Sequence, residues 1–219
     1  MKKAWICLTR IPEPGRTKTR LMPVLTGEEC AALHTAFLRD MNELSREVEA
    51  DLFVAYTQGE GWEVLREIFP GAKGFFLQEG EELGLRMHRA MERVLSLGYD
   101  RCVLTGADLP GMTAKHIESG FGALDAADAV LGPTPDGGYY LIGLKQPCIA
   151  LFQQQTYGHG SVFAATVAAA ERAGCRMAEA MPCSDVDTPE ELAALRESCR
   201  RRDSHTARCL AEIFREEQA

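Results

Sequence analysis

Three cationic side chains alternate within one short segment of this 219-residue chain, PGRTKTRL. They are Arg16, Lys18 and Arg20, each separated from the next by a threonine. Guanidinium and ammonium groups close together, beside loop amides, are the donors that a diphosphate requires, and arginine can engage two phosphate oxygens at once. The segment predicts a diphosphate site, with a solvated basic loop as the alternative. Neither a Walker-type phosphate loop nor the glycine pattern of a dinucleotide dehydrogenase fits the sequence.

Two segments carry aspartates that could bind a divalent cation. Asp108 stands in GADLP, directly after an apolar run, and a carboxylate in that place is a natural oxygen ligand for Mg²⁺ or Mn²⁺ beside substrate phosphates. Helix capping is the alternative role. Asp185 and Asp187 stand in DVDT, where alternate residues of an extended segment face the same way and could meet one cation.

A further segment, GPTPDGGYYLIGL, contains a loop with unusual backbone freedom. Gly137 and Gly138 would let the backbone approach a ligand closely, and Asp136 would project into the same region. A tight hairpin turn is the alternative, since Asp-Gly is a frequent turn dipeptide.

The elements that position these residues follow from hydrophobic periodicity. Strands are predicted at residues 4–9, 51–57, 75–77, 101–105, 129–132, 139–144 and 176–180. Helices are predicted at 26–41, 62–69, 81–97, 113–124, 149–154 and 162–173, from 188, and from about 203 to the end. Threonine followed by glutamate three residues later predicts capping boxes at Thr26 and Thr188. Strands that alternate with helices indicate a three-layer αβα fold with a mainly parallel sheet, whose ligands bind at the carboxyl ends of the strands.

Composition narrows the function further. We expect one domain over residues 1–219, because no linker or break in composition interrupts the sequence. A net charge of −8 argues against a broad basic face for nucleic acid. The first apolar run is too short for a signal peptide, so we expect a cytoplasmic protein without a membrane span. The eight cysteines form no C-x-x-C pair, which argues against a zinc site.

Taken together, the motifs resemble a family. PGRTKTRL, ELGLRM, GADLP, GPTPDGGYYLIGL and DVDT occur in the order seen in the glycosyltransferase-like proteins called selenodomain-associated transferase 1, of the DUF2064 type, over roughly Ala4 to Leu195. That family is similar in fold to GT-A glycosyltransferases and to nucleotidyltransferases. The resemblance implies a GT-A-like nucleotide-diphospho-sugar transferase fold, with a divalent metal, Mg²⁺ or Mn²⁺, at Asp108 and Asp187. The chain departs from the usual pattern at Glu82, Leu85, Tyr157 and His159.

Three functions remain open at this point. The first is glycosyl transfer from a nucleotide sugar, and the second is nucleotidyl transfer from a nucleoside triphosphate to a small phosphorylated or sugar acceptor. The third is a nucleotide-binding module without catalysis. Under the first, Asp136 or His159 would orient or deprotonate the acceptor. Arg86, from ELGLRM, would contact a phosphate or sugar, with an exposed helix arginine as the alternative.

Overall fold

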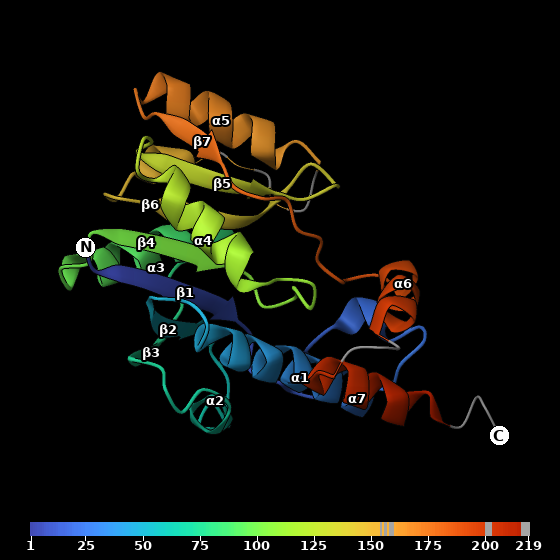
Figure 1. The fold of residues 1–219 in the computed structure, drawn as a ribbon. Coiled ribbons are helices and arrows are strands. Elements are labelled where there is room, and N and C mark those ends of the chain that lie inside the picture. The colour runs from blue at the N-terminus through green and yellow to red at the C-terminus, as the bar shows by residue number, and fades with distance from the viewer. Residues whose placement is uncertain (154, 156, 158–159, 200–202, 216–219) are drawn as a thin grey trace.

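A seven-stranded sheet runs through the centre of the computed structural model, which describes residues 1–153, 155, 157, 160–199 and 203–215 (Figure 1). Its order is β3-β2-β1-β4-β6-β5-β7. The strands are β1 (Lys3–Thr9), β2 (Asp51–Tyr56), β3 (Gly74–Leu77), β4 (Arg101–Thr105), β5 (Ala129–Pro133), β6 (Tyr139–Leu144) and β7 (Met177–Glu179). Strand β6 runs antiparallel to its neighbours β4 and β5, whereas the other pairs are parallel.

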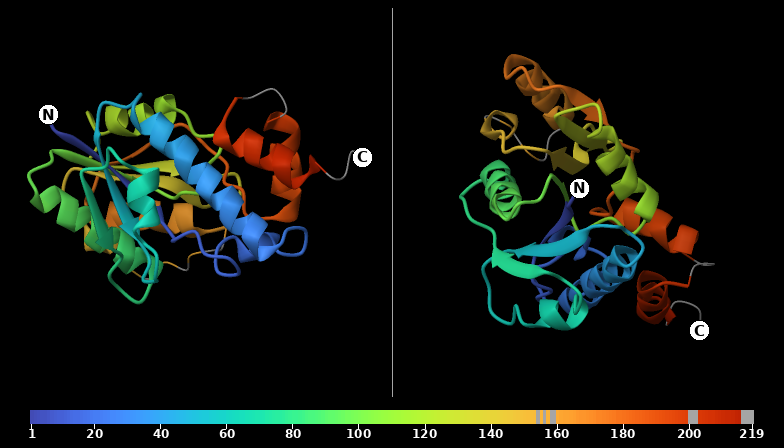
Figure 2. Two further views of the ribbon diagram at one scale, coloured as in Figure 1. Left: turned by 90° about the horizontal axis from the view of Figure 1, so that it is seen from below. Right: turned by 60° about the vertical axis from the view of Figure 1, so that its left-hand side comes forward.

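Helices cover both faces of this sheet, as the two views in Figure 2 show. They are α1 (Gly27–Ser45), α2 (Val64–Ile68), α3 (Leu83–Ser96), α4 (Ala114–Ala123), α5 (Val162–Arg172), α6 (Pro189–Cys199) and α7 (His205–Ile213), with 3₁₀ turns η1 (Thr19–Leu21) and η2 (Ile149–Leu151). Helices α1, α2 and α4 pack on one face, and α3 and α5 pack on the other. The predicted three-layer α/β fold is therefore confirmed.

The central strand β1 shows why the sequence adopts this arrangement. Trp5 and Cys7 contribute to the core on one face of the sheet, and Ala4 and Ile6 contribute to the core on the other. Successive side chains of a strand point to opposite faces, so a strand covered on both sides must be apolar throughout. The apolar run before the basic loop is such a strand, and it directs that loop to the carboxyl edge of the sheet.

The predicted strands and helices are present, with differences of a few residues at their ends. Both capping boxes form, and the Thr26 amide donates to Glu29 Oε2 at 2.7 Å. Two segments differ from expectation: the end of the basic loop folds into η1, and the predicted helix at 149–154 is the short turn η2. No helix among the described residues has both the length and the apolar character that a membrane span requires.

Helices α6 and α7 belong to a third apolar cluster at the carboxyl edge of the sheet (Figure 1). The cluster also includes Leu21 and Leu25 from the segment after β1 and Phe37 from α1. Asp40 on α1 fastens α7, because its two carboxylate oxygens accept the backbone N–H groups of His205 and Thr206 at 2.7 and 3.0 Å. The cluster thus joins the basic loop to the segment that carries Asp187.

We expect Asp40→Ala to lower the free energy of unfolding by about 1–2 kcal/mol, because two backbone N–H groups in the first turn of α7 lose their acceptor while Ser204 still caps the helix. Urea denaturation would measure the change. Glu43→Ala is the matched control on α1, since Glu43 makes an exposed ion pair with Arg46 and its loss should cost less than about 0.5 kcal/mol. Equal losses in the two variants would contradict the capping role.

Candidate functional site

Two aspartates and a lysine meet where β1 and β4 end. Lys18 Nζ lies 2.7 Å from Asp108 Oδ1 and 3.1 Å from Asp187 Oδ1. It also donates a hydrogen bond to the carbonyl oxygen of Val186. The Lys18 side chain is only 2% exposed, so this ammonium is buried between the two carboxylates. Three residues that the sequence predicts for the site, from three distant segments, are therefore in direct contact.

The backbone fixes the two aspartates relative to each other. The Val186 amide donates to the carbonyl oxygen of Asp108 at 3.0 Å, which joins the two segments. Glu191, in the first turn of α6, accepts the amides of Asp187 and Thr188 at 2.7 and 2.8 Å. A side chain of α6 therefore caps the start of that helix and fixes the backbone at Asp187.

Each aspartate keeps an oxygen that does not contact Lys18. The Asp108 side chain is 37% exposed although its Oδ1 is buried, so Oδ2 is the oxygen open to a ligand. The Asp187 side chain is 35% exposed, and its Oδ2 lies 3.6 Å from Arg20 Nη1. Burial raises the pKa of Asp108, but the contact with His34 and the charge of Lys18 outweigh it and hold the pKa well below its ordinary range. Asp108 is therefore a carboxylate at neutral pH.

These donors fit a divalent cation that is shared with a substrate. Mg²⁺ is usually bound through one or two carboxylates together with substrate phosphates and water. Among the described residues, no group of three or more histidine, cysteine or acidic side chains is arranged to hold a metal ion. The outward oxygens of Asp108 and Asp187 match the substrate-shared arrangement rather than an all-protein cage.

His34 on α1 is a member of the site that the sequence did not reveal. Its Nδ1 lies 3.4 Å from Asp108 Oδ1, and its Nε2 lies 3.1 Å from Thr9 Oγ1 and 3.3 Å from the carbonyl oxygen of Arg10. The ring thus links the end of β1 to Asp108. In the sequence it sits among the buried positions of an amphipathic helix, where a histidine carries no sign of a role at a strand terminus.

The two arginines of the basic loop lie at the surface. Arg16 and Arg20 are each 72% exposed. Arg16 pairs with Glu13 at 3.5 Å, and Arg20 makes the long contact with Asp187 described above. Because an exposed ion pair at such distances is weak, both guanidinium groups remain available to an incoming anion.

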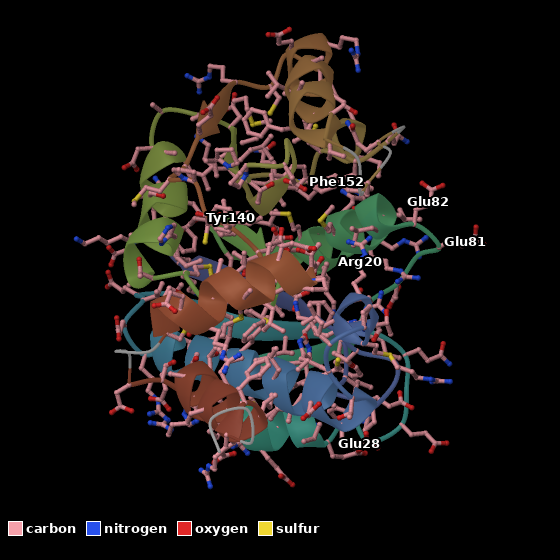
Figure 3. All side chains as sticks on the ribbon, turned by 90° about the vertical axis from the view of Figure 1, so that its right-hand side faces the viewer. Arg20, Glu28, Glu81, Glu82, Tyr140 and Phe152 are labelled. Atoms are coloured by element: carbon pink, nitrogen blue, oxygen red, sulfur yellow. The ribbon has the colours of Figure 1, made fainter. Side chains whose placement is uncertain are left out.

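Arg86 turns toward its own loop. Its Nε donates to the carbonyl oxygen of Gly80 at 2.8 Å, and its Nη2 donates to that of Glu81 at 3.3 Å. These bonds tie the loop after β3 to the first turn of α3. Figure 3 views the carboxyl edge of the sheet and labels Arg20 together with Glu81 and Glu82 of this loop.

Asp136 forms a tight turn with its neighbours. Its Oδ1 accepts a hydrogen bond from the Thr134 hydroxyl and another from the Gly138 amide, the second at 3.0 Å. The Thr134 hydrogen bond is the main cause of a lowered pKa of Asp136, which the Gly138 amide supports and partial burial opposes. Asp136 is therefore an ionised hydrogen-bond acceptor at neutral pH.

The Asp136 turn lies within electrostatic range of the DVDT segment. Burial, followed by the charge of Asp187, raises the pKa of Asp185, and the charges of Asp136 and Glu191 contribute to the same rise. The carbonyl oxygen of Pro133 accepts the Cys183 amide at 3.2 Å, so the hairpin that carries this turn lies beside the segment that leads to Asp185 and Asp187. The predicted catalytic residue His159 lies outside the described residues.

Gly137 allows a close approach, and the partner is the protein's own backbone. Its φ is +85°, and a Cβ placed there would collide with the carbonyl oxygen of Gly160. Its carbonyl oxygen also accepts the amide of Phe163 at 3.1 Å, in the first turn of α5. A Cβ on Gly138 would lie 3.0 Å from Thr134 Oγ1, inside the turn. Both glycines thus shape the turn that presents Asp136.

Fold and site together define the class of protein with a nucleotide-diphospho-sugar transferase-like fold. The chain belongs to the family of uncharacterized proteins conserved in bacteria called DUF2064, whose model matches residues 26–159. The resemblance seen in the sequence is thereby confirmed. No curated protein sequence matches the chain.

Solved structures have the same nucleotide-diphospho-sugar transferase-like fold. A protein from Desulfovibrio desulfuricans G20, provisionally assigned as a nucleotide-diphospho-sugar transferase, is 32% identical with a TM-score of 0.89, over 99% of this chain and 98% of its own. A cytidylyltransferase from Leptospira borgpetersenii is 15% identical with a TM-score of 0.60, over 100% and 95%. The manganese complex of Rv0371c from Mycobacterium tuberculosis is 16% identical with a TM-score of 0.52, over 90% and 100%. The two distant structures share the fold.

We expect Gly137→Val to destabilise the protein by about 1–3 kcal/mol, because a branched side chain would be strained at positive φ and would collide with Gly160. Thermal unfolding would measure the loss. Gly111→Val is the control, since a Cβ at Gly111 meets nothing within 4 Å. If both variants melt at the temperature of the parent, the close packing at Gly137 is not needed.

Proposed function

We propose that this protein is a metal-dependent transferase that uses a nucleotide-diphospho-sugar donor. The observation that carries the proposal is the meeting of Asp108 and Asp187, each with one oxygen directed away from Lys18. Two exposed arginines come from the same loop as Lys18. This combination of carboxylates and cations is suited to a diphosphate that carries a divalent cation. The 32% identical relative, provisionally assigned as a nucleotide-diphospho-sugar transferase, supports the choice of donor.

The donor side of the site acts by binding charge. Arg16 and Arg20 hold the phosphate oxygens and stabilise the negative charge that grows on the departing diphosphate. Asp108 and Asp187 would hold Mg²⁺ or Mn²⁺, which would supply further charge neutralisation at the leaving group. The manganese complex of the distant relative agrees with a metal in this fold. Arg86 supports the donor side indirectly, because it fixes the loop at Gly80.

The acceptor side is the turn at Asp136. One carboxylate oxygen is occupied by Thr134 and Gly138, so the other is the one that accepts a hydrogen bond from an acceptor hydroxyl. The lowered pKa makes Asp136 a weak base. We therefore assign it to orienting the acceptor, and keep His159 as the candidate for removing the proton.

Nucleotidyl transfer is the second candidate function. A cytidylyltransferase shares the fold over nearly its whole length, and the same cations would stabilise a departing pyrophosphate. The products separate the two reactions, because a nucleotidyltransferase releases pyrophosphate from a nucleoside triphosphate and a glycosyltransferase releases a nucleoside diphosphate. Tight nucleotide binding with neither product, over a panel of sugar and phosphorylated acceptors, would indicate a non-catalytic module.

We expect Arg16→Ala and Arg20→Ala each to weaken the binding of nucleoside diphosphates and nucleotide sugars by about tenfold, because each removes a charge-assisted hydrogen bond. Calorimetric titration in the presence of Mn²⁺ would measure the affinities. Arg172→Ala is the control, since Arg172 is an exposed arginine in the last turn of α5. The diphosphate site would be wrong if both loop variants bound every candidate nucleotide as tightly as the parent.

We expect Asp108→Asn to weaken Mn²⁺-dependent nucleotide binding about tenfold or more, because one carboxylate charge at the cation is lost. A chelator added to the parent protein should have a similar effect. The control is Asp100→Asn, which makes the same substitution at an exposed residue before β4, away from the carboxyl edge. Nucleotide affinity that is indifferent to both the chelator and Asp108→Asn would refute the metal bridge.

A further inference from the structure

The Lys18 ammonium has no donor left for a phosphate. An ammonium group has three N–H bonds, and Lys18 Nζ directs them to Asp108 Oδ1, Asp187 Oδ1 and the carbonyl oxygen of Val186. Arg16 and Arg20, from the same alternating pattern, are exposed. Lys18 is therefore a buried, fully hydrogen-bonded cation, whereas Arg16 and Arg20 are open to solvent.

The backbone directs Lys18 inward. Its φ of 55° makes it the one residue other than glycine with a left-handed conformation in the described part of the chain. Such a conformation costs free energy and persists only where the surroundings hold it. Here the carbonyl oxygen of Lys18 accepts hydrogen bonds from the Leu21 amide and the Cys30 thiol, and Thr17 is tied to the carbonyl oxygen of Ile11.

The buried position has a further contact. Lys18 Nζ lies 5.1 Å from the ring centre of Phe37, on the face of α1 that packs against the third apolar cluster. A charge in such a place is expensive unless it is paired. Its pairing with two carboxylates is therefore obligatory for the lysine, and equally the lysine is what permits two carboxylates to lie side by side.

We propose that Lys18 is a positioning residue that acts as the internal counter-ion of the site and holds Asp108 and Asp187 together before a divalent cation binds. Lys18 neutralises one of the two carboxylate charges and competes for the same carboxylates through Oδ1. A divalent cation alone then binds weakly at the outer oxygens, and a nucleotide diphosphate supplies the additional negative charge that makes its binding tight. The role of the carboxylates toward a metal rests on the proposed function.

The test is Lys18→Met, studied with Mn²⁺ alone and without nucleotide. In chelator, the melting temperature of Lys18→Met should fall by several degrees, because Asp108 and Asp187 lose the ammonium group that lies between them. Mn²⁺ should restore the melting temperature, and its affinity should rise by about tenfold or more relative to the parent, because no ammonium competes. The control is Lys115→Met, which removes an exposed lysine of α4 and should change neither quantity.

A second variant keeps the test decisive if Lys18→Met does not fold in chelator. Lys18→Met combined with Asp187→Asn removes the opposing charge as well, and should recover the lost stability while losing the rescue by Mn²⁺. The proposal is overturned if Lys18→Met melts like the parent in chelator and binds Mn²⁺ unchanged, or if neither variant folds with or without Mn²⁺. Failure of the proposed function would appear separately, as absence of nucleotide binding by the parent protein.

Discussion

The buried contact of one ammonium with two carboxylates is the constraint around which this edge of the protein is arranged. Lys18 reaches Asp108 and Asp187 because its own left-handed backbone conformation turns its side chain toward the sheet. The Val186 amide then pins the two aspartate segments together through the backbone. Burial strengthens these charge interactions, since screening by water is weaker there. The third apolar cluster maintains the arrangement by packing α6 and α7 against α1.

Much of the fold follows from the sequence because the relevant signals are local. Hydrophobic periodicity locates the strands and helices, and the threonine and glutamate spacing locates two helix starts that the structure confirms. The sequence also predicts Lys18, Asp108 and Asp187 for the site, since each follows or precedes a recognisable element. It does not predict their direct contact, because that depends on backbone dihedrals that no spacing reveals. Alternation in PGRTKTRL suggests three equivalent cations, whereas the turn at Lys18 and η1 gives one buried cation and two exposed ones.

Other features of the site depend on tertiary contacts in the same way. His34 is indistinguishable in sequence from a core position of α1, and its link to Asp108 exists only after α1 packs on β1 and β4. Gly137 is predicted either to let a ligand approach closely or to form a tight turn, and the group that packs against it in the structure is the backbone of Gly160. Arg86 is predicted either to contact a phosphate or sugar or to be an exposed helix arginine, and its hydrogen bonds go to the carbonyl oxygens of Gly80 and Glu81. For His34 and Gly137 the partner comes from a distant part of the chain, whereas the partners of Arg86 lie only five and six residues before it.

The antiparallel direction of β6 places the Asp136 turn on a hairpin, whereas Lys18 and Asp108 lie in loops that follow parallel strands. Because β6 runs antiparallel to β4 and β5, the turn that joins β5 to β6 lies at the same edge of the sheet as the carboxyl ends of the parallel strands. The Asp136 turn is the tip of that hairpin, whereas Lys18 and Asp108 follow β1 and β4. A hairpin can change its length or tip residues without shifting the register of the parallel strands beside it. Under the proposed function, a change of the Asp136 hairpin would therefore alter the acceptor side of the site and leave Lys18, Asp108 and Asp187 in place.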